Sequence, residues 1–189
     1  MAEAKNKHWA IVIDSAKCID CKACDVACKR ENGVEANGRR EVYRNWITSK
    51  GVEGTYPNLK QRFEPSQCHH CANTPCYKVC PTSATYKNDD GLIMMDYKRC
   101  IMCATCIAAC PYDARYYSRQ KKSIDKCTFC DHRIYVGKLP ACVDTCPTVV
   151  RVFGDLNDPE SEVSKILASR HYFVIKPEAG TKPNLYYLT

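Results

Sequence analysis

Apolar residues in this 189-residue chain occur in short runs separated by polar, glycine-containing or proline-containing segments. The runs at Trp9–Ile13, 92–95 and 172–175 have the length and composition of β-strands. Residues 161–170 predict a short helix, and residues 42–51 predict a hairpin-like stretch followed by a polar return. No run approaches the length needed to cross a membrane, so we expect no direct membrane span. The pattern predicts small α and β elements, the α+β class.

The composition lowers the expected size of the aliphatic core. The hydrophobic fraction of 45% includes 16 cysteines and 12 tyrosines. Without them only about 30% of the chain is ordinary apolar residues, which is low for a domain of this length. We therefore expect something other than aliphatic packing to fill part of the interior. The first residues contain neither the apolar region of a secretory signal nor a twin-arginine pair, so we expect no leader.

Every cysteine belongs to one of four groups of four. Groups one and three share the spacing Cys-x2-Cys-x2-Cys-x3-Cys, group two has Cys-x2-Cys-x4-Cys-x3-Cys, and group four has Cys-x2-Cys-x11-Cys-x3-Cys. The groups are, in order, Cys18, Cys21, Cys24 and Cys28; Cys68, Cys71, Cys76 and Cys80; Cys100, Cys103, Cys106 and Cys110; and Cys127, Cys130, Cys142 and Cys146. Proline follows the last cysteine of groups two, three and four, whereas group one has Lys29 there. Four sets of four predict four tetrathiolate sites.

Iron–sulfur clusters account for this spacing better than zinc or disulfides do. Zinc usually takes two Cys-x2-Cys pairs separated by roughly 12–20 residues. Three cysteines crowded into Cys-x2-Cys-x2-Cys can each meet a different iron of a cubic cluster. In bacterial ferredoxins the fourth, followed by proline, ligates the other cluster of a pair. Disulfide frameworks are typical of shorter, secreted chains. The spacing therefore predicts 4Fe–4S clusters, with a zinc-bound structural module as a minor alternative.

An internal duplication relates the four groups. Residues 14–28 align without gaps onto residues 96–110, and groups two and four both end in Cys-Pro-Thr. Groups two and three are joined through a turn at 86–91, as in the hairpin between the halves of a two-cluster ferredoxin. Groups one and four then pair across that unit. The alternative is two consecutive units, group one with two and group three with four.

Exchange of the fourth cysteine within each pair gives four predicted ligand sets. Cluster a takes Cys18, Cys21, Cys24 and Cys146; cluster b takes Cys127, Cys130, Cys142 and Cys28; cluster c takes Cys68, Cys71, Cys76 and Cys110; and cluster d takes Cys100, Cys103, Cys106 and Cys80. We expect two bacterial-ferredoxin-like modules, each with two clusters, plus a small β-hairpin insert and a C-terminal extension. Residues 1–61 with 120–160 would form one module, residues 62–119 the inserted module, and residues 161–189 a docking tail.

The four motifs, the stretches 126–133, 137–142 and 146–158, and the tail at 176–187 resemble the small iron–sulfur subunits of molybdopterin oxidoreductases. The resemblance covers nearly the whole chain. The family includes polysulfide, thiosulfate, tetrathionate and dimethyl sulfoxide reductases, and the tail looks most like the polysulfide and thiosulfate branch. In this family group one pairs with four and group two with three. Because all sixteen cysteines are present, the resemblance implies four 4Fe–4S clusters.

The resemblance implies a non-catalytic electron-transfer subunit. It would carry electrons between an integral-membrane, quinol-oxidising subunit and a molybdenum bis(pyranopterin) catalytic subunit that reduces a sulfur compound. It would lie at the membrane surface through these partners, on the periplasmic face by co-export, with the cytoplasmic face as the alternative. A polyferredoxin-type subunit of a formate dehydrogenase or hydrogenase complex is the alternative function. A cluster with four thiolates has no open position for substrate, and the chain carries no phosphate loop, dinucleotide fingerprint or nucleophile–base motif.

Other side chains and the charge refine this hypothesis. With four cysteines available per site, we expect His69 and His70 to face solvent or hydrogen-bond to sulfur rather than bind iron. Ile19, Ile101 and Ile107 are expected to keep water off the clusters. Four clusters of about −2 each would bring the formal charge of +7 to about −1. The basic residues therefore predict counter-charge for clusters, and we expect no nucleic-acid partner.

Overall fold

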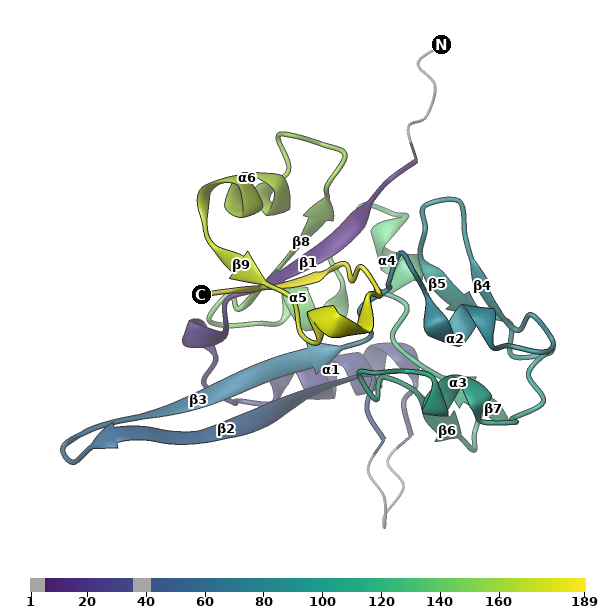
Figure 1. Cartoon of the computed structure of the whole chain (residues 1–189), viewed down its shortest axis with the longest axis horizontal. Helices are drawn as coiled ribbons and strands as arrows, with labels where there is room; N and C mark the ends of the chain where they lie inside the picture. Colours follow the sequence, from purple (N-terminus) through teal and green to yellow (C-terminus); the bar gives the residue numbers. More distant parts are fainter. Residues whose placement is uncertain (1–5, 36–41) are drawn as a thin grey trace.

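The computed structural model describes residues 6–35 and 42–189 (Figure 1). Residues 1–5 and 36–41 of the predicted outer module lie outside the described range. Two 3-10 turns, η1 (Ser15–Lys17) and η2 (Pro177–Ala179), accompany the helices and strands. The mixture of short helices and small sheets agrees with the expected α+β class.

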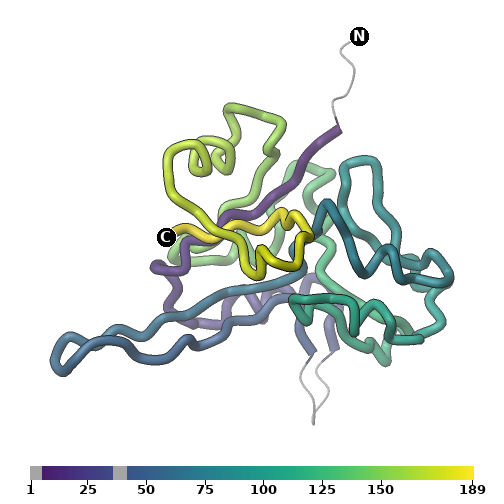
Figure 2. Tube along the Cα trace, viewed as in Figure 1, coloured from purple at the N-terminus to yellow at the C-terminus, as the bar shows by residue number. Residues whose placement is uncertain are grey.

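A four-stranded sheet joins the beginning of the chain to its last residues. Its strand order is β8 (Arg151–Asp155), β1 (Trp9–Ile13), β10 (Leu185–Leu188) and β9 (Tyr172–Phe173). Strand β1 is antiparallel to β8 and parallel to β10, and Figure 2 shows these traces running side by side. The predicted C-terminal extension thus supplies one interior strand and one edge strand of this sheet.

Helix α6 (Glu162–Ser169) covers part of the sheet. Its buried Val163 packs with Val12 of β1 and Leu188 of β10. The sequence prediction of a short helix and a strand in this region is confirmed, although β9 is shorter than predicted. Burial of these branched aliphatic side chains stabilises the contact by roughly 1.5–3 kcal/mol each.

The hairpin of β2 (Asn45–Thr55) and β3 (Asn58–Gln67) projects from the body of the molecule (Figure 1). Its register shifts between Ser49 and Val52, and most of its length is exposed. The predicted hairpin-like stretch, residues 42–51, covered only part of the first strand, and the polar return pairs with that strand as β3. Only the base of the hairpin, around Asn45 and Gln67, is buried.

Short helices carry many of the cysteines. Helix α1 (Ala23–Asn32) ends where Gly33 adopts a left-handed conformation that favours glycine. Four further helices form single turns, α2 (Pro75–Lys78), α3 (Thr105–Ala108), α4 (Asp131–Ile134) and α5 (Ala141–Asp144). These short helices leave the cysteine loops between them close to one another.

Two small hairpins complete the fold. Strands β4 (Thr85–Lys87) and β5 (Ile93–Met95) pair around the predicted turn, and β6 (Tyr116–Ser118) pairs with β7 (Ser123–Asp125). The main core combines aliphatic and aromatic side chains with thiols, and Ile11, Ile13 and Tyr187 share it with Cys68 and Cys127. Thiols are therefore part of the packed interior, beside a larger number of aliphatic side chains.

Candidate metal centres

Three cavities of the structure are each lined by four cysteines. Their volumes, including space open to solvent, are 300, 270 and 330 Å³. The first is lined by Cys18, Cys21, Cys24 and Cys146, the second by Cys28, Cys127, Cys130 and Cys142, and the third by Cys68, Cys71, Cys76 and Cys110. The sequence predicted these same groupings for clusters a, b and c.

The remaining four cysteines gather beside the two small hairpins. Cys80, Cys100 and Cys106 belong to one core cluster with Ile93 and Ile124. The Thr85 N–H donates to Cys80 Sγ at 3.5 Å, and the Ile124 N–H donates to Cys100 Sγ at 3.5 Å. Cys80 lies close enough to Cys103 and Cys106 to interact electrostatically with both thiols.

All sixteen thiols are free of disulfides. Among residues 6–35 and 42–189, no three His, Cys, Asp or Glu side chains converge as ligands of a single ion would. The thiols line the walls of cavities instead. Thiolate sulfur is the ligand set that 4Fe–4S clusters take, so the donors fit such a group.

The backbone of the cysteine loops is unusual in a repeated way. Residues inside the loops adopt positive φ, among them Asp20, His70, Met102 and Phe129. The third residue after the last cysteine does so in groups two, three and four, at Ser83, Asp113 and Val149. A left-handed residue other than glycine costs roughly 1–2 kcal/mol and persists only where its surroundings hold it.

Backbone N–H groups point at the sulfur atoms as a result of this folding. Phe129 N–H donates to Cys127 Sγ at 3.3 Å, and Val150 N–H donates to Cys146 Sγ at 3.3 Å. Hydrogen bonds to sulfur are one of the protein's means of setting cluster potential. The strained loops therefore supply donors for charged sulfur.

Burial acts against ionisation of the interior thiols. It raises the pKa of Cys71 and of Cys142 to about 12 and that of Cys28 to about 11. At the surface, hydrogen bonds from the Thr105 hydroxyl and N–H lower the pKa of Cys103. Interior thiolates thus need nearby positive charge, from metal ions or cationic side chains, to exist at neutral pH.

Three buried cations lie among the thiols. Arg115, Arg151 and Lys126 are 5%, 2% and 0% exposed. No carboxylate forms an ion pair with any of them within the described part of the chain. Buried cations require compensating negative charge, which thiolates and anionic clusters supply. This unbalanced charge is a second, independent fit to iron–sulfur clusters.

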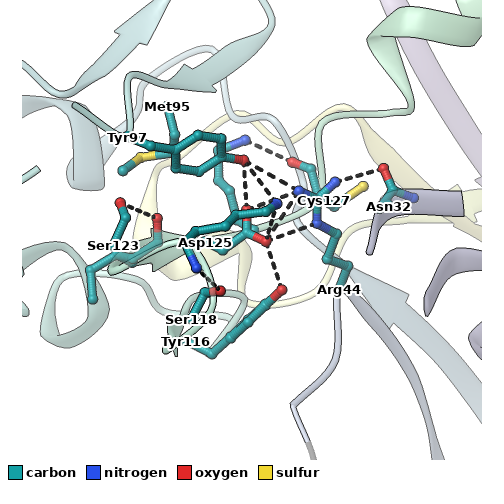
Figure 3. Close-up of polar contacts among 12 residues, drawn as sticks. Asn32, Arg44, Met95, Tyr97, Tyr116, Ser118, Ser123, Asp125 and Cys127 are labelled. Carbon is teal, nitrogen blue, oxygen red and sulfur yellow. Dashed lines mark hydrogen bonds and ion pairs between the residues drawn. The ribbon is translucent and has the colours of Figure 1, made fainter. Parts of the chain in front are cut away.

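A fourth buried cation is paired. Arg44 donates to Asp125, which also accepts hydrogen bonds from Tyr97 Oη at 2.9 Å and Tyr116 Oη at 2.7 Å (Figure 3). Arg44 also donates to Asn32 Oδ1 at 2.7 Å. Asn32 Nδ2 lies 3.7 Å from Cys28 Sγ and 3.6 Å from Cys130 Sγ. The network thus extends to the second cavity.

Both histidines between the group-two cysteines are buried, so the expectation that they face solvent is wrong. His70 Nδ1 accepts from the Ile93 N–H at 3.1 Å, and its Nε2–H donates to the Cys127 carbonyl at 3.0 Å. His69 lines the third cavity and stacks on Tyr112, and its ring nitrogens have no hydrogen-bond partner among the described residues. Burial lowers the pKa of His69 to about 3 and that of His70 well below its usual range. Segments distant in sequence bury both rings.

The expected shielding by isoleucine holds at only one position. Ile107 packs against the Cys106 core cluster, but Ile19 and Ile101 are 61% and 63% exposed. Both belong to loops whose side chains turn outward beside exposed Cys21 and Cys103. Within this chain, these two side chains do not exclude water.

Arg115 and Arg151 were missed in the sequence. Both stand five positions after the last cysteine of their group, in the pattern Cys-Pro-x3-Arg. The recurrence of this pattern after the last cysteines of groups three and four could have marked them.

Comparisons with known proteins agree with this geometry. Residues 59–156 and 17–84 each match a 4Fe-4S dicluster domain family. A tetrathionate reductase subunit of Salmonella typhimurium is 39% identical, over 98% of this chain and 74% of the relative. A polysulfide reductase chain of Wolinella succinogenes is 42% identical over 95% and 93% of the two chains. A putative dimethyl sulfoxide reductase iron-sulfur subunit of Halobacterium salinarum is 38% identical over 96% and 79%.

Two dicluster domains and sixteen cysteines correspond to four 4Fe–4S clusters. Across the described residues, no helix has the length and apolar character of a membrane span. The relatives are each the B subunit or B chain of a reductase, and the Halobacterium relative is an iron-sulfur subunit by name. The chain therefore belongs to the family of iron–sulfur electron-transfer subunits of molybdopterin-type respiratory reductases.

Proposed function

We propose that the chain conducts electrons between a membrane subunit that oxidises quinol and a molybdopterin catalytic subunit that reduces a sulfur compound. Family membership supports the electron-transfer role, and the polysulfide and tetrathionate reductase relatives favour a sulfur-compound acceptor. A 4Fe–4S cluster with four thiolates supplies reversible one-electron transfer. The chain's own residues hold the clusters, exclude water from them and set their potentials.

The proposed ligands are the four sets predicted from the sequence. Cysteines of clusters a, b and c line one cavity each, and those of cluster d gather beside β4 and β7. This grouping also supports two interleaved modules, residues 1–61 with 120–160 around residues 62–119. Because β10 lies within the sheet of the outer module, any docking by residues 161–189 would use the exposed face of β9 and α6.

The shared elements support the linear order a, b, c, d. Helix α1 carries Cys24 of cluster a and Cys28 of cluster b. Helix α2 and the residues after it carry Cys76 of cluster c and Cys80 of cluster d. Clusters b and c meet where His70, from the group-two loop, donates to the carbonyl of Cys127.

The single observation that carries this electron-transfer path is the exposure of its two ends, clusters a and d. Sets a and d each contain one exposed cysteine, Cys21 and Cys103, whereas sets b and c contain none. Exposed Ile19 and Ile101 stand beside these ends. Electrons must enter and leave where a cluster approaches the surface, and partner subunits would cover these apolar side chains.

The proposed function places the chain at a membrane surface. The relatives are subunits of multi-subunit reductases, which supports attachment to a membrane through partner subunits. We place the chain on the periplasmic face by co-export with its catalytic partner, with the cytoplasmic face as the alternative outcome.

Purification tests the proposal directly. A tagged chain extracted with detergent from anaerobically grown cells should copurify with a molybdenum-containing large subunit and a hydrophobic subunit. A quinol analogue should then bleach the cluster absorbance, and a sulfur-compound acceptor should restore it. Recovery as a lone monomer from the soluble fraction would favour the polyferredoxin alternative.

A further inference from the structure

Two buried arginines occupy equivalent places in the two halves of the molecule. Arg115 and Arg151 each follow a Cys-Pro-x3 segment, at Cys110 and Cys146. Arg115 immediately precedes β6, Arg151 begins β8, and each lines the wall of a cysteine cavity. Each predicted module therefore holds one buried arginine, at the same spacing from the last cysteine of its second group.

Arg115 contacts a cysteine of one predicted cluster and reaches the neighbouring cluster through Thr85. Its Nη2 donates to Cys76 Sγ, in set c, at 3.0 Å. Its Nη1 donates to Thr85 Oγ1 at 3.1 Å, and the Thr85 N–H donates to Cys80 Sγ, in set d, at 3.5 Å. The guanidinium thus stands between the third and fourth sites.

Arg151 has the matching position in the other half. It lines the cavity of set a, together with Cys24 and Cys146. Its Nη1 donates to Gln67 Oε1, and Gln67 lines the cavity of set b, where Cys142 Sγ lies 3.9 Å from the same oxygen. In each half, one arginine contacts one site and reaches its neighbour through a polar side chain.

Carboxylates do not neutralise these two charges. The described residues pair Arg44 with Asp125 but give neither Arg115 nor Arg151 an acidic partner. One guanidinium nitrogen of each, Arg115 Nε and Arg151 Nη2, has no hydrogen-bond acceptor in the described chain. A guanidinium stays charged even when buried, and an unpaired buried charge acts over a long range at low dielectric.

We propose that Arg115 and Arg151 are fixed counter-charges that raise the reduction potentials of both clusters of their own module. The proposal rests on the ligand sets of the proposed function. Each added electron makes a cluster about one unit more negative, so a nearby cation stabilises the reduced form more than the oxidised form. The cation also reduces the repulsion between electrons on neighbouring clusters. Arg115 therefore acts on clusters c and d, and Arg151 on clusters a and b.

Redox titration of the purified, cluster-loaded protein, in its complex or as the chain is isolated without partners, is followed by electron paramagnetic resonance and tests this assignment. Arg115→Gln should lower two midpoint potentials and leave the other two unchanged. Arg151→Gln should lower the other two. Arg115→Lys and Arg151→Lys keep the charge and should stay near wild type. Arg62→Gln, on the exposed hairpin, is the control for loss of one surface charge and should shift none.

Two results would overturn the proposal. One is an equal shift of all four potentials, or no shift, in both glutamine variants. The other is equal loss of iron from the lysine and glutamine variants, which would assign these side chains to packing. Iron loss confined to the glutamine variants would support a need for the charge. Potentials are measured whether or not the chain exchanges electrons with a partner, so failure here differs from failure of copurification.

Discussion

Arg44 and Asp125 form an ion pair of 2.9 Å with side chains only 4% and 1% exposed. Arg44 precedes β2 in the outer part of the chain, and Asp125 ends β7 next to the inserted part. The pair closes a gap of 81 positions in the sequence. It therefore fixes the base of the long hairpin against the segment that leads to Cys127.

Removal of Arg44 should destabilise the protein strongly. Arg44→Met leaves the buried Asp125 carboxylate without its more deeply buried cation, at a cost of about 3 kcal/mol. The midpoint of denaturant-induced loss of cluster absorbance, measured without oxygen, should fall. Lys121→Met is the matched control, because Lys121 reaches the same carboxylate from a more exposed position and should cost about 1 kcal/mol or less. Equal effects of the two variants would contradict the importance of burial.

The contribution of Asp125 should be insensitive to pH near neutrality. Burial would raise its pKa, but Arg44 and Lys121 lower it overall to about 2. A carboxyl with a lowered pKa contributes stability above its unfolded pKa of about 3.9 and loses it as the pH falls towards the folded value. The difference in midpoint between wild type and Asp125→Asn should therefore stay constant from about pH 5 to pH 8. A difference that shrinks within this range would refute the assignment.

Metal analysis should find about sixteen iron atoms and about sixteen acid-labile sulfides per chain. Removal of the iron with a chelator should collapse the tertiary structure, because thiols from segments distant in the sequence share the main core and would be joined only through the clusters. Near-ultraviolet circular dichroism of the stripped protein measures this loss. Zinc without labile sulfide would point instead to the structural-module alternative.

The exposed side chains of Ile19 and Ile101, beside clusters a and d, should be needed for binding to partner subunits rather than for folding. Ile19→Glu and Ile101→Glu should each weaken recovery of one partner subunit while iron content stays at the wild-type level. The reason is that a charge at a covered apolar contact must be desolvated. Val136→Glu, at an exposed apolar residue with no exposed cysteine beside it, serves as the control. Loss of iron from the isoleucine variants would instead mean that these residues support the clusters.

The 4Fe–4S clusters could be predicted because the cysteine spacing is a local feature of the sequence. The four ligand sets stay a prediction, which the cavities lined by the cysteines of sets a, b and c support. The side chains that surround the cysteines could not be predicted. Burial of His70 depends on contacts with Ile93 and Cys127, which no local pattern contains. Strand β3 was missed because its polar residues pair with an exposed partner strand and carry no apolar alternation. The position of β10 between β1 and β9 is likewise a non-local property.

The position of β10 also sets the order in which the protein can be completed during synthesis. Strand β1 leaves the ribosome long before either of its two neighbours, β8 and β10. The proposed ligands of clusters c and d all lie between Cys68 and Cys110, a continuous stretch that is made before both neighbours. We expect the inserted module to accept its iron before β10 is made, and the outer module only after β10 has joined β1. Maturation of the protein would then begin with clusters c and d, and β1 would wait unpaired until the inserted module is complete.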